Sequence, residues 1–352
     1  MKIHVNKKRW HFAILNVFFV ILSVFFAVFF LVISHKLDSV AAADRWRGEN
    51  ELRFAQIGCF LPVDSPKNEE DIMIFRRTLD QKLLDSSLHA ADGTCLYADA
   101  YSGQARLTVT GSHGKSEVNA IGVGGKFFLF HPLQLLSGSY ISGTDLMQDR
   151  VILDETLAWQ LFGGSNVAGM TVYVGETPLY VAGVVHCEND YASREAYGDM
   201  PVMFISYSAF HALTETGITC YEIVMPDMIS GFAKNIVKDN FDVGNGDIVE
   251  NSSRYAVTNL MQVIKDFGVR SMRHNGVIYP YWENAVRMTE DHLALLLVLT
   301  SLFAAVPVFT VSFCVIRLVI SFYQRAATTI PKKVSAARER KREDRYARIG
   351  EK

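Results

Sequence analysis

The stretch that decides the architecture of this chain is Phe12–Ser34, which reads FAILNVFFVILSVFFAVFFLVIS, 23 residues without a charge. A second uncharged run, of 24 residues, lies at Leu293–Ile316 and reads LALLLVLTSLFAAVPVFTVSFCVI. A helix rises about 1.5 Å per residue, so each run reaches about 35 Å and can cross a hydrocarbon core about 30 Å thick. We therefore predict two transmembrane helices, and everything between them must lie on one side of the membrane.

The distribution of charge indicates which side this is. Residues 1–10 carry four Lys/Arg and no acid, and the chain from Arg325 onward carries ten Lys/Arg against four Asp/Glu. Residues 37–290 carry 19 Lys/Arg against 32 Asp/Glu, a net charge of −13. Because basic flanks stay in the cytoplasm, we predict a membrane protein with both termini cytoplasmic and the middle segment extracytoplasmic.

These boundaries divide the chain into five segments. They are a basic cytoplasmic N-terminus (1–11), a first span (12–34), an extracytoplasmic domain (35–292), a second span (293–316) and a basic cytoplasmic tail (317–352). A cleaved signal peptide is the competing interpretation of the first run, since small residues follow it at Ala41–Ala43. The apolar region of a signal peptide has about 7–15 residues, so the length of this run favours a retained helix.

Cysteine usage agrees with an extracytoplasmic middle segment. Cys59, Cys95, Cys187 and Cys220 fall within it, and Cys314 stands alone in the second span. Neighbours along the chain suggest the disulfides Cys59–Cys95 and Cys187–Cys220, because disulfides persist in oxidising compartments. The alternative is four reduced, buried thiols. The sequence contains no CxxC and no Cys/His cluster, so we expect no metal site.

Strand and helix patterns alternate through the middle segment, which predicts an α+β domain of one unit or two lobes. We expect strands at 52–61, 118–123, 151–153, 170–174, 179–185, 202–205 and 221–225, helices at 154–161, 229–241 and 253–267, and a hairpin of 96–100 with 105–109 turning at Ser102-Gly103. We expect a further helix to open at Ser65-Pro66 and to bury the stripe Ile72, Phe75, Leu79 and Leu83. In the tail, Ile330-Pro331 is expected to break the helix that follows the second span.

Motifs that carry chemistry are weak in this sequence. Gly114-Lys115-Ser116 resembles the end of a phosphate-binding loop, but the required Gly is replaced by Val109, so we interpret the segment as a hairpin turn. Gly122–Gly125 lacks the final glycine of a dinucleotide fingerprint. His186-Cys187-Glu188 fits the end of a strand better than a nucleophile or a metal site. The sequence therefore predicts a protein that is not an enzyme and binds no cofactor and no nucleic acid.

One stretch carries more specific information. The segments concerned are Ile121–Val123, Lys126–Phe128, Leu136–Tyr140, Asp145-Leu146, Val151–Ala158, Leu161–Gly164, Val167–Val172 and Tyr180–Val185. Their order resembles the extracytoplasmic core domain of the MacB/FtsX-type ABC transporter permeases. The resemblance is close over roughly residues 110–210, and the order of span, outer domain and span extends it loosely over the whole chain.

The resemblance implies a subunit of the bacterial plasma membrane that transmits motion without catalysis. In such permeases, closure of cytoplasmic ATPases moves the membrane helices, and the outer domain follows. The implied partners are an ABC ATPase, a second permease-like chain and membrane lipid, and the expected coupling junction is Tyr281-Trp282-Glu283-Asn284, just before the second span. The resembled permeases usually carry two further spans, so we expect a half-size subunit. The alternatives are a membrane-anchored extracytoplasmic sensor or regulator and, with least support, an anchored ectoenzyme.

Overall fold

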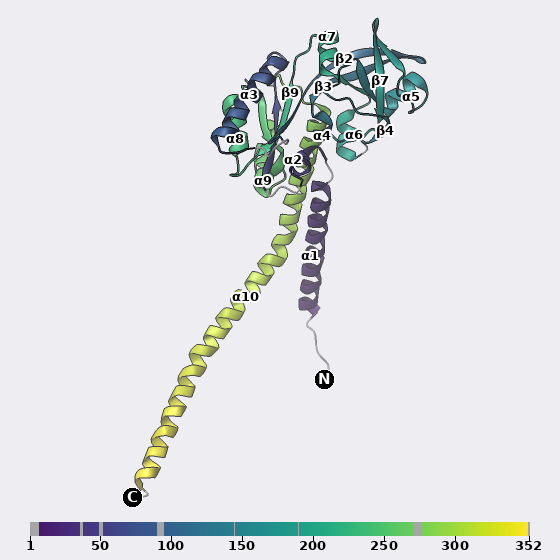
Figure 1. The fold of residues 1–352 in the computed structure, drawn as a ribbon. Helices are drawn as coiled ribbons and strands as arrows, with labels where there is room; N and C mark the ends of the chain where they lie inside the picture. The colour runs from purple at the N-terminus through teal and green to yellow at the C-terminus, as the bar shows by residue number, and fades with distance from the viewer. Residues whose placement is uncertain are drawn as a thin grey trace. The chain divides into compact units, whose positions relative to one another are not determined.

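The computed structural model describes residues 7–35, 38–48, 52–89, 95–143, 145–188, 190–270 and 276–350 (Figure 1). Val32–Ala294 forms one compact unit, the domain unit, and the chain on either side of it forms a helical unit. The predicted cytoplasmic N-terminus lies partly outside the described residues, and so does the very end of the predicted tail.

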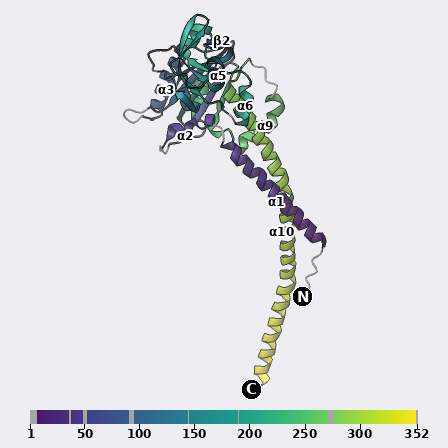
Figure 2. The same ribbon diagram turned by 90° about the vertical axis from the view of Figure 1, so that its right-hand side faces the viewer.

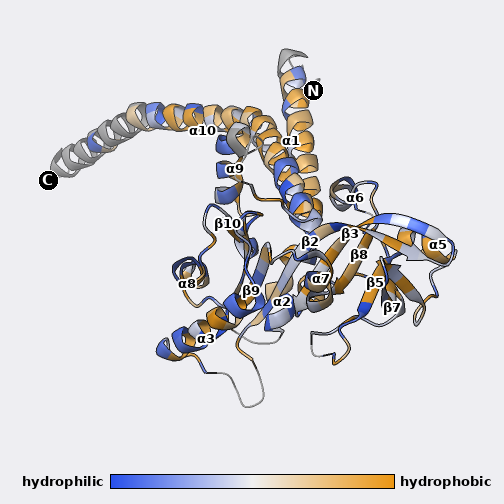
Figure 3. Cartoon of the chain, turned by 90° about the horizontal axis from the view of Figure 1, so that it is seen from above, coloured by the Kyte–Doolittle hydropathy of each residue, from blue (hydrophilic) through white to orange (hydrophobic). Residues whose placement is uncertain are grey.

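The helical unit contains α1 (Lys7–Ser34) and the part of α10 (Tyr281–Gly350) from Leu295 onward. The ring of Phe303 packs against Phe19 and Phe26, with centroids 5.9 and 5.5 Å apart, and Ser23 Oγ donates a hydrogen bond of 3.3 Å to the carbonyl of Thr300. Figure 3 shows α1 and the middle of α10 as mostly hydrophobic. Trp10–Ser34 and Tyr281–Ala327 are long and apolar enough to cross a membrane.

The predicted break at Ile330-Pro331 is wrong. Helix α10 continues through Pro331 to Gly350 (Figure 2). A proline removes one backbone N–H and crowds the preceding turn, but the Ala, Lys, Arg and Glu residues that follow it favour helix strongly. Their combined propensity allows the helix to continue beyond the proline.

The domain unit is built on one sheet of ten strands, which runs β10-β1-β9-β2-β3-β8-β5-β7-β4, with β6 pairing to β2 and β7. The strands are β1 (Phe54–Phe60), β2 (Ala98–Gly111), β3 (Gly114–Gly125), β4 (Leu135–Gly138), β5 (Arg150–Asp154), β6 (Thr171–Val174), β7 (Thr177–Val185), β8 (Val202–Ser206), β9 (Cys220–Pro226) and β10 (Asp247–Glu250). Two pairings, β3 with β8 and β5 with β7, are parallel, and the others are antiparallel. Together with the helices, this mixed sheet confirms the predicted α+β class.

Strand β2 joins two parts of this sheet. Because β6 pairs with both β2 and β7, the strands β2, β3, β8, β5, β7 and β6 close into a ring, while β9, β1 and β10 extend from its side. The predicted hairpin at Ser102-Gly103 is wrong, since β2 runs straight through both residues. A Cβ on Gly103 would lie 2.6 Å from the carbonyl oxygen of Gly217, so this glycine permits a close approach between backbones rather than a turn.

Eight helices and two short 3₁₀ helices are described in the domain unit before α10. They are η1 (Asp38–Val40), α2 (Ala42–Arg47), α3 (Glu69–Asp85), α4 (Phe127–Phe130), α5 (Glu155–Phe162), α6 (Tyr191–Tyr197), α7 (Tyr207–Thr214), α8 (Phe232–Asn240), η2 (Asn251–Ser253) and α9 (Val257–Arg270). The predicted apolar stripe of α3 is buried. The predicted start of α3 is wrong, because Asn68 and Asp71 form a reciprocal capping box and fix its N-terminus three residues later than expected.

Two hydrophobic cores lie on the two faces of the sheet. One packs α3, α5, α7 and α8 against it and fills the ring of strands. The other holds α2, α4 and the first residues of α10. Tyr281 and Trp282 are each 5% exposed and belong to this second core. The first turn of α10 is thus part of the folded domain.

Candidate functional site

The first turns of α10 are fixed to the domain by aromatic packing. The Trp282 ring lies 4.4 Å from the His131 ring and 5.4 Å from that of Phe127, measured between centroids. The Tyr281 ring packs edge-on against Tyr197 at 4.9 Å. Buried aromatic pairs of this kind contribute about 0.5–1.5 kcal/mol each beyond the area they bury. The helix is therefore held by α4, by the segment after it and by α6.

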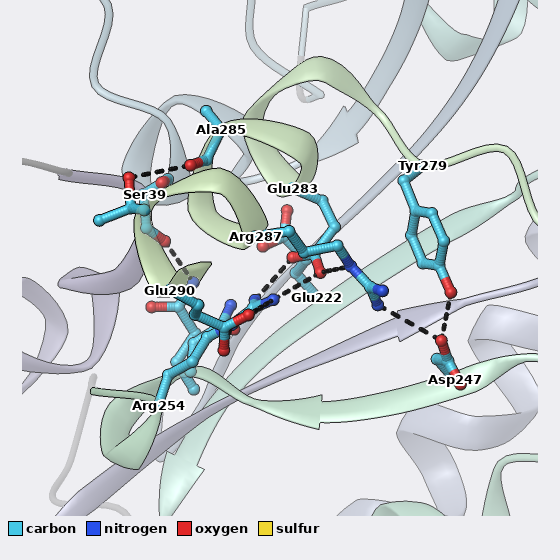
Figure 4. A network of polar contacts seen from close by, with 12 residues as sticks. Ser39, Glu222, Asp247, Arg254, Tyr279, Glu283, Ala285, Arg287 and Glu290 are labelled. Atoms are coloured by element: carbon cyan, nitrogen blue, oxygen red, sulfur yellow. Dashed lines mark hydrogen bonds and ion pairs between the residues drawn. The ribbon is translucent and has the colours of Figure 1, made fainter. Parts of the chain in front are cut away.

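A buried network of charges forms the second attachment of α10 (Figure 4). Arg254 donates to both oxygens of Glu283, each at 2.7 Å, and its Nε donates to Glu290 at 2.6 Å. Arg287 Nε donates to Glu283 at 2.6 Å, and Arg287 Nη2 lies 3.3 Å from the Asp247 carboxylate on β10. Glu283, Arg287 and Glu290 lie at spacings of four and three, so they share one face of α10.

The network extends to the chain around it. Arg254 Nη1 also donates to Asn251 Oδ1 at 3.0 Å, and the hydroxyl of Tyr279 donates to Asp247. The guanidinium of Arg287 lies over the Tyr279 ring, 3.8 Å from its centroid. The network therefore ties α10 to β10, to η2 and to the segment that precedes the helix.

These charges are stable in the interior because each has opposite charges and hydrogen bonds at close range. The side chains of Arg254, Glu283 and Glu290 are 4, 2 and 8% exposed. Burial alone would raise the pKa of Glu283, but the charges and hydrogen bonds of Arg254 and Arg287 outweigh it and hold that pKa below its ordinary value. Glu283 is thus ionised, and removal of either arginine would leave a buried charge under-compensated.

A second polar group lies beside Trp282 and Tyr281. His131 Nε2 is 2.5 Å from Glu222 Oε2, and both residues are buried. Burial raises the pKa of Glu188, although His131 and Tyr281 act in the opposite direction. This group joins α10 to β9 and to the segment after β7.

The predicted junction residues differ in how far they are buried. Tyr281, Trp282 and Glu283 are buried in the domain, whereas Asn284 is exposed, and its Nδ2 donates to the carbonyl of Tyr279 at 3.2 Å. Arg254 was not foreseen, since it lies 29 residues before Glu283 and belongs to no motif. The spacing of Glu283, Arg287 and Glu290 next to an apolar span was a signal that the sequence did contain.

All five cysteines are free in the structure, so the two expected disulfides stay a prediction. The sheet does not favour either pairing. Cys59 on β1 pairs with Tyr221 on β9, which in turn pairs with Tyr101 on β2. Cys95 lies six residues before Tyr101 and ahead of the first residue of β2, about 20 Å away at strand spacing. Cys220 and Cys187 belong to segments separated by several strands of the sheet.

The remaining motifs have structural roles. Gly114 and Lys115 begin β3 directly after the β2–β3 turn, in agreement with the predicted hairpin. His186 Nδ1 lies 2.8 Å from Glu155, and Cys187 Sγ lies 3.6 Å from Thr156 Oγ1. Within the described part of the chain, no group of three or more His, Cys, Asp or Glu side chains could hold a metal ion.

A family model and several solved structures are similar to this chain. The profile of the MacB-like periplasmic core domain matches residues 13–228. The periplasmic region of MacB from Actinobacillus actinomycetemcomitans is 16% identical, with a TM-score of 0.42, over 60% of this chain and 92% of that one. The extracellular domain of the noncanonic ABC-type transporter YknZ from Gram-positive bacteria is 15% identical, with a TM-score of 0.35, over 54% and 90%.

A domain of a permease protein from Porphyromonas gingivalis is 11% identical, with a TM-score of 0.33, over 60% of this chain and 96% of that one. A comparison with curated proteins gave no match.

Proposed function

This chain belongs to the MacB-like periplasmic core domain family, and from that premise we propose that it is a non-catalytic, permease-like subunit of an ABC transporter. In this proposal, motion driven by a cytoplasmic ATPase reaches the extracytoplasmic domain through α10. The ATPase and a second permease-like chain are its protein partners, and lipid surrounds its two spans. Both termini lie in the cytoplasm of a bacterial cell.

The observation that supports this role is the way α10 begins. A helix that only anchored a domain would need no more than a flexible linker. Here the first turns of α10 carry a buried aromatic pair and three charged residues in a buried network, and the same helix contains a candidate membrane span. Such an attachment resists bending at the junction, which a rigid-body mechanism requires.

The experiment inserts seven residues between Asp291 and His292, beyond the charge network. One variant receives Gly-Gly-Ser-Gly-Gly-Ser-Gly, which behaves as a flexible coil. The matched variant receives Ala-Glu-Ala-Ala-Ala-Lys-Ala, which continues the helix and changes its phase by only about 20°. Both add the same length. The full chain is co-purified with its ATPase partner in lipid nanodiscs, and ATP hydrolysis and the transport or resistance phenotype are measured.

The flexible insertion should abolish the phenotype and uncouple ATP hydrolysis from the outer domain, and the helical insertion should retain most of both. Equal function of the two variants at equal membrane levels would show that motion does not pass through this helix. Co-purification without any ATPase would instead favour the second candidate, a membrane-anchored sensor or regulator. That candidate is supported by the cleft beside β10, which could hold an extracytoplasmic ligand.

A further inference from the structure

One end of the sheet is open. Strand β10 is the last in the strand order and, among the described residues, pairs only with β1. A strand at a sheet edge presents backbone N–H and C=O groups that another strand can bind. Natural proteins usually shorten, charge or cover such an edge, so what lies beside β10 decides whether the edge is usable.

A groove of about 560 Å³ lies beside β10, within the domain unit. Its walls are Ile248, Val249 and Glu250 of β10, Ser230 and Lys234 at α8, and Thr258, Asn259, Gln262, Val263 and Asp266 of α9. Figure 3 shows β10 lying between α8 and α9. The volume falls in the range of about 300–1,000 Å³ typical of ligand sites. The edge is thus flanked by two helices but not filled by them.

The chemistry of the groove favours a ligand that donates hydrogen bonds. The Oε1 atom of Glu250 is buried and accepts no hydrogen bond from a described residue, because its ion pair with Arg53 has a distance of 3.6 Å. Of the other charged residues in the lining, Glu290 and Arg254 pair with each other, and Asp266 adds a carboxylate and Lys234 a cation. The segment 37–290 carries a net charge of −13, which attracts cations over a distance of about a Debye length.

We propose that this groove binds a short, extended, basic peptide segment, which adds as a strand to the free edge of β10 and places a cationic side chain at Glu250. Main-chain hydrogen bonds to β10 supply most of the affinity, and Glu250 selects for positive charge. Arg254 and Glu290 form the floor of the groove and also hold α10. The site itself does not depend on the coupling role proposed above.

The test uses the full chain in nanodiscs of neutral lipid and three fluorescent pentapeptides. The first is Lys-Val-Lys-Val-Lys with blocked ends. The second has the same sequence with alternate backbone nitrogens methylated, so it keeps its charge and loses strand donors. The third is Glu-Val-Glu-Val-Glu. Fluorescence anisotropy should show saturable binding of the first, binding at least about tenfold weaker for the second, and none for the third.

Variants of the chain locate the site. Thr258→Trp fills the groove from α9 and should abolish binding, whereas Met261→Trp, on the same helix but outside the lining, should leave it unchanged. Glu250→Gln should weaken binding of the basic peptide severalfold, and Glu176→Gln, on the exposed β6–β7 turn, should not. Circular dichroism confirms that each variant folds. Equal binding of the methylated peptide, equal binding by Thr258→Trp, or no saturable binding would each overturn the proposal.

Discussion

At the scale of single residues, the attachment of α10 depends most on Arg254. Its guanidinium makes five hydrogen bonds to the side chains of Asn251, Glu283 and Glu290. A buried ion pair adds little net stability compared with apolar residues of the same shape, but breaking it by removing one partner is costly. The network therefore specifies where α10 begins more than it increases the stability of the domain.

Replacing Arg254 by Met should lower the free energy of unfolding by about 3–5 kcal/mol, because two buried carboxylates lose their main partner. Thermal and denaturant unfolding of the purified chain, followed by tryptophan fluorescence, measures the loss. Arg47→Met breaks an exposed pair with Asp44 and should cost about 0–1 kcal/mol. Adding Glu283→Met and Glu290→Met to Arg254→Met should restore part of the stability. A loss below about 1 kcal/mol for Arg254→Met alone would contradict the role assigned to this residue.

Two carboxyl groups near the junction should make the stability of the domain depend on pH in opposite directions. Glu283 has a pKa below the ordinary 4.5 in the folded protein, so its contribution is complete above about pH 4.5 and is lost as the pH falls below it. Glu188 has a pKa raised mainly by burial, so its ionisation costs stability above about pH 4.5. At pH 7, Glu283→Gln should therefore destabilise the folded domain, and Glu188→Gln should stabilise it.

Both differences from the parent chain should shrink as the pH falls from 5 to 3. Melting temperatures measured at half-unit steps of pH give the two curves. Curves of the same sign, or differences that do not change with pH, would show that charge is not the cause.

At the scale of elements, α7 can lie on the ring of strands because β2 and β3 present glycines to it. A Cβ on Gly122 would lie 2.4 Å from the ring of Phe210, and one on Gly103 would lie 3.1 Å from the same ring. Phe210 is fully buried. The two glycines face each other across the β2–β3 pair, and together they form the flat surface against which α7 packs.

Gly122→Ala should cost about 1–3 kcal/mol, since the methyl group would force the Phe210 side chain or the whole of α7 to move. Gly164→Ala is the matched control, because a Cβ there meets no atom within 4 Å and its backbone conformation suits any residue. That control should change stability by no more than about 0.5 kcal/mol. The melting temperatures of the two variants are compared, and equal values would refute the packing argument.

At the scale of the whole molecule, the chain is a membrane protein with an extracytoplasmic domain between two helices long enough to span a bilayer. The predicted orientation of the termini rests on charge alone. Cys95 is exposed on the domain, while burial raises the pKa of Cys59 and Cys220 and makes them poor nucleophiles. This contrast provides a natural probe of both topology and oxidation.

A membrane-impermeant maleimide should label Cys95 in intact cells, in a chain whose other cysteines are replaced by Ser or Ala. A chain whose only cysteine comes from Ala337→Cys, at an exposed position of the tail, should react only after permeabilisation. The reverse pattern would place the termini outside. With all native cysteines present, labelling of Cys95 only after reduction would support the predicted Cys59–Cys95 disulfide. Labelling without reduction would exclude that disulfide.

Local sequence was sufficient for several parts of this fold. The two apolar runs, the helix expected at 154–161 and the strands expected at 170–174 and 179–185 were all predicted from neighbouring residues and are all present. In each case the deciding interaction joins residues only a few positions apart, such as the Asp154 carboxylate and the backbone N–H of Leu157. Propensity, periodicity and capping are therefore visible in the sequence itself.

Only the tertiary structure decided the rest. The passage of β2 through Gly103 depends on Gly217 and Phe210, which are distant in sequence and close in space. The charge network joins Arg254 to residues 29 and 36 positions later. A local pattern cannot report such pairs, because a buried arginine and a solvated one have the same neighbours in the chain. The sequence by itself thus determined the spans, the acidity and the class of the domain, and packing decided how α10 is joined to it.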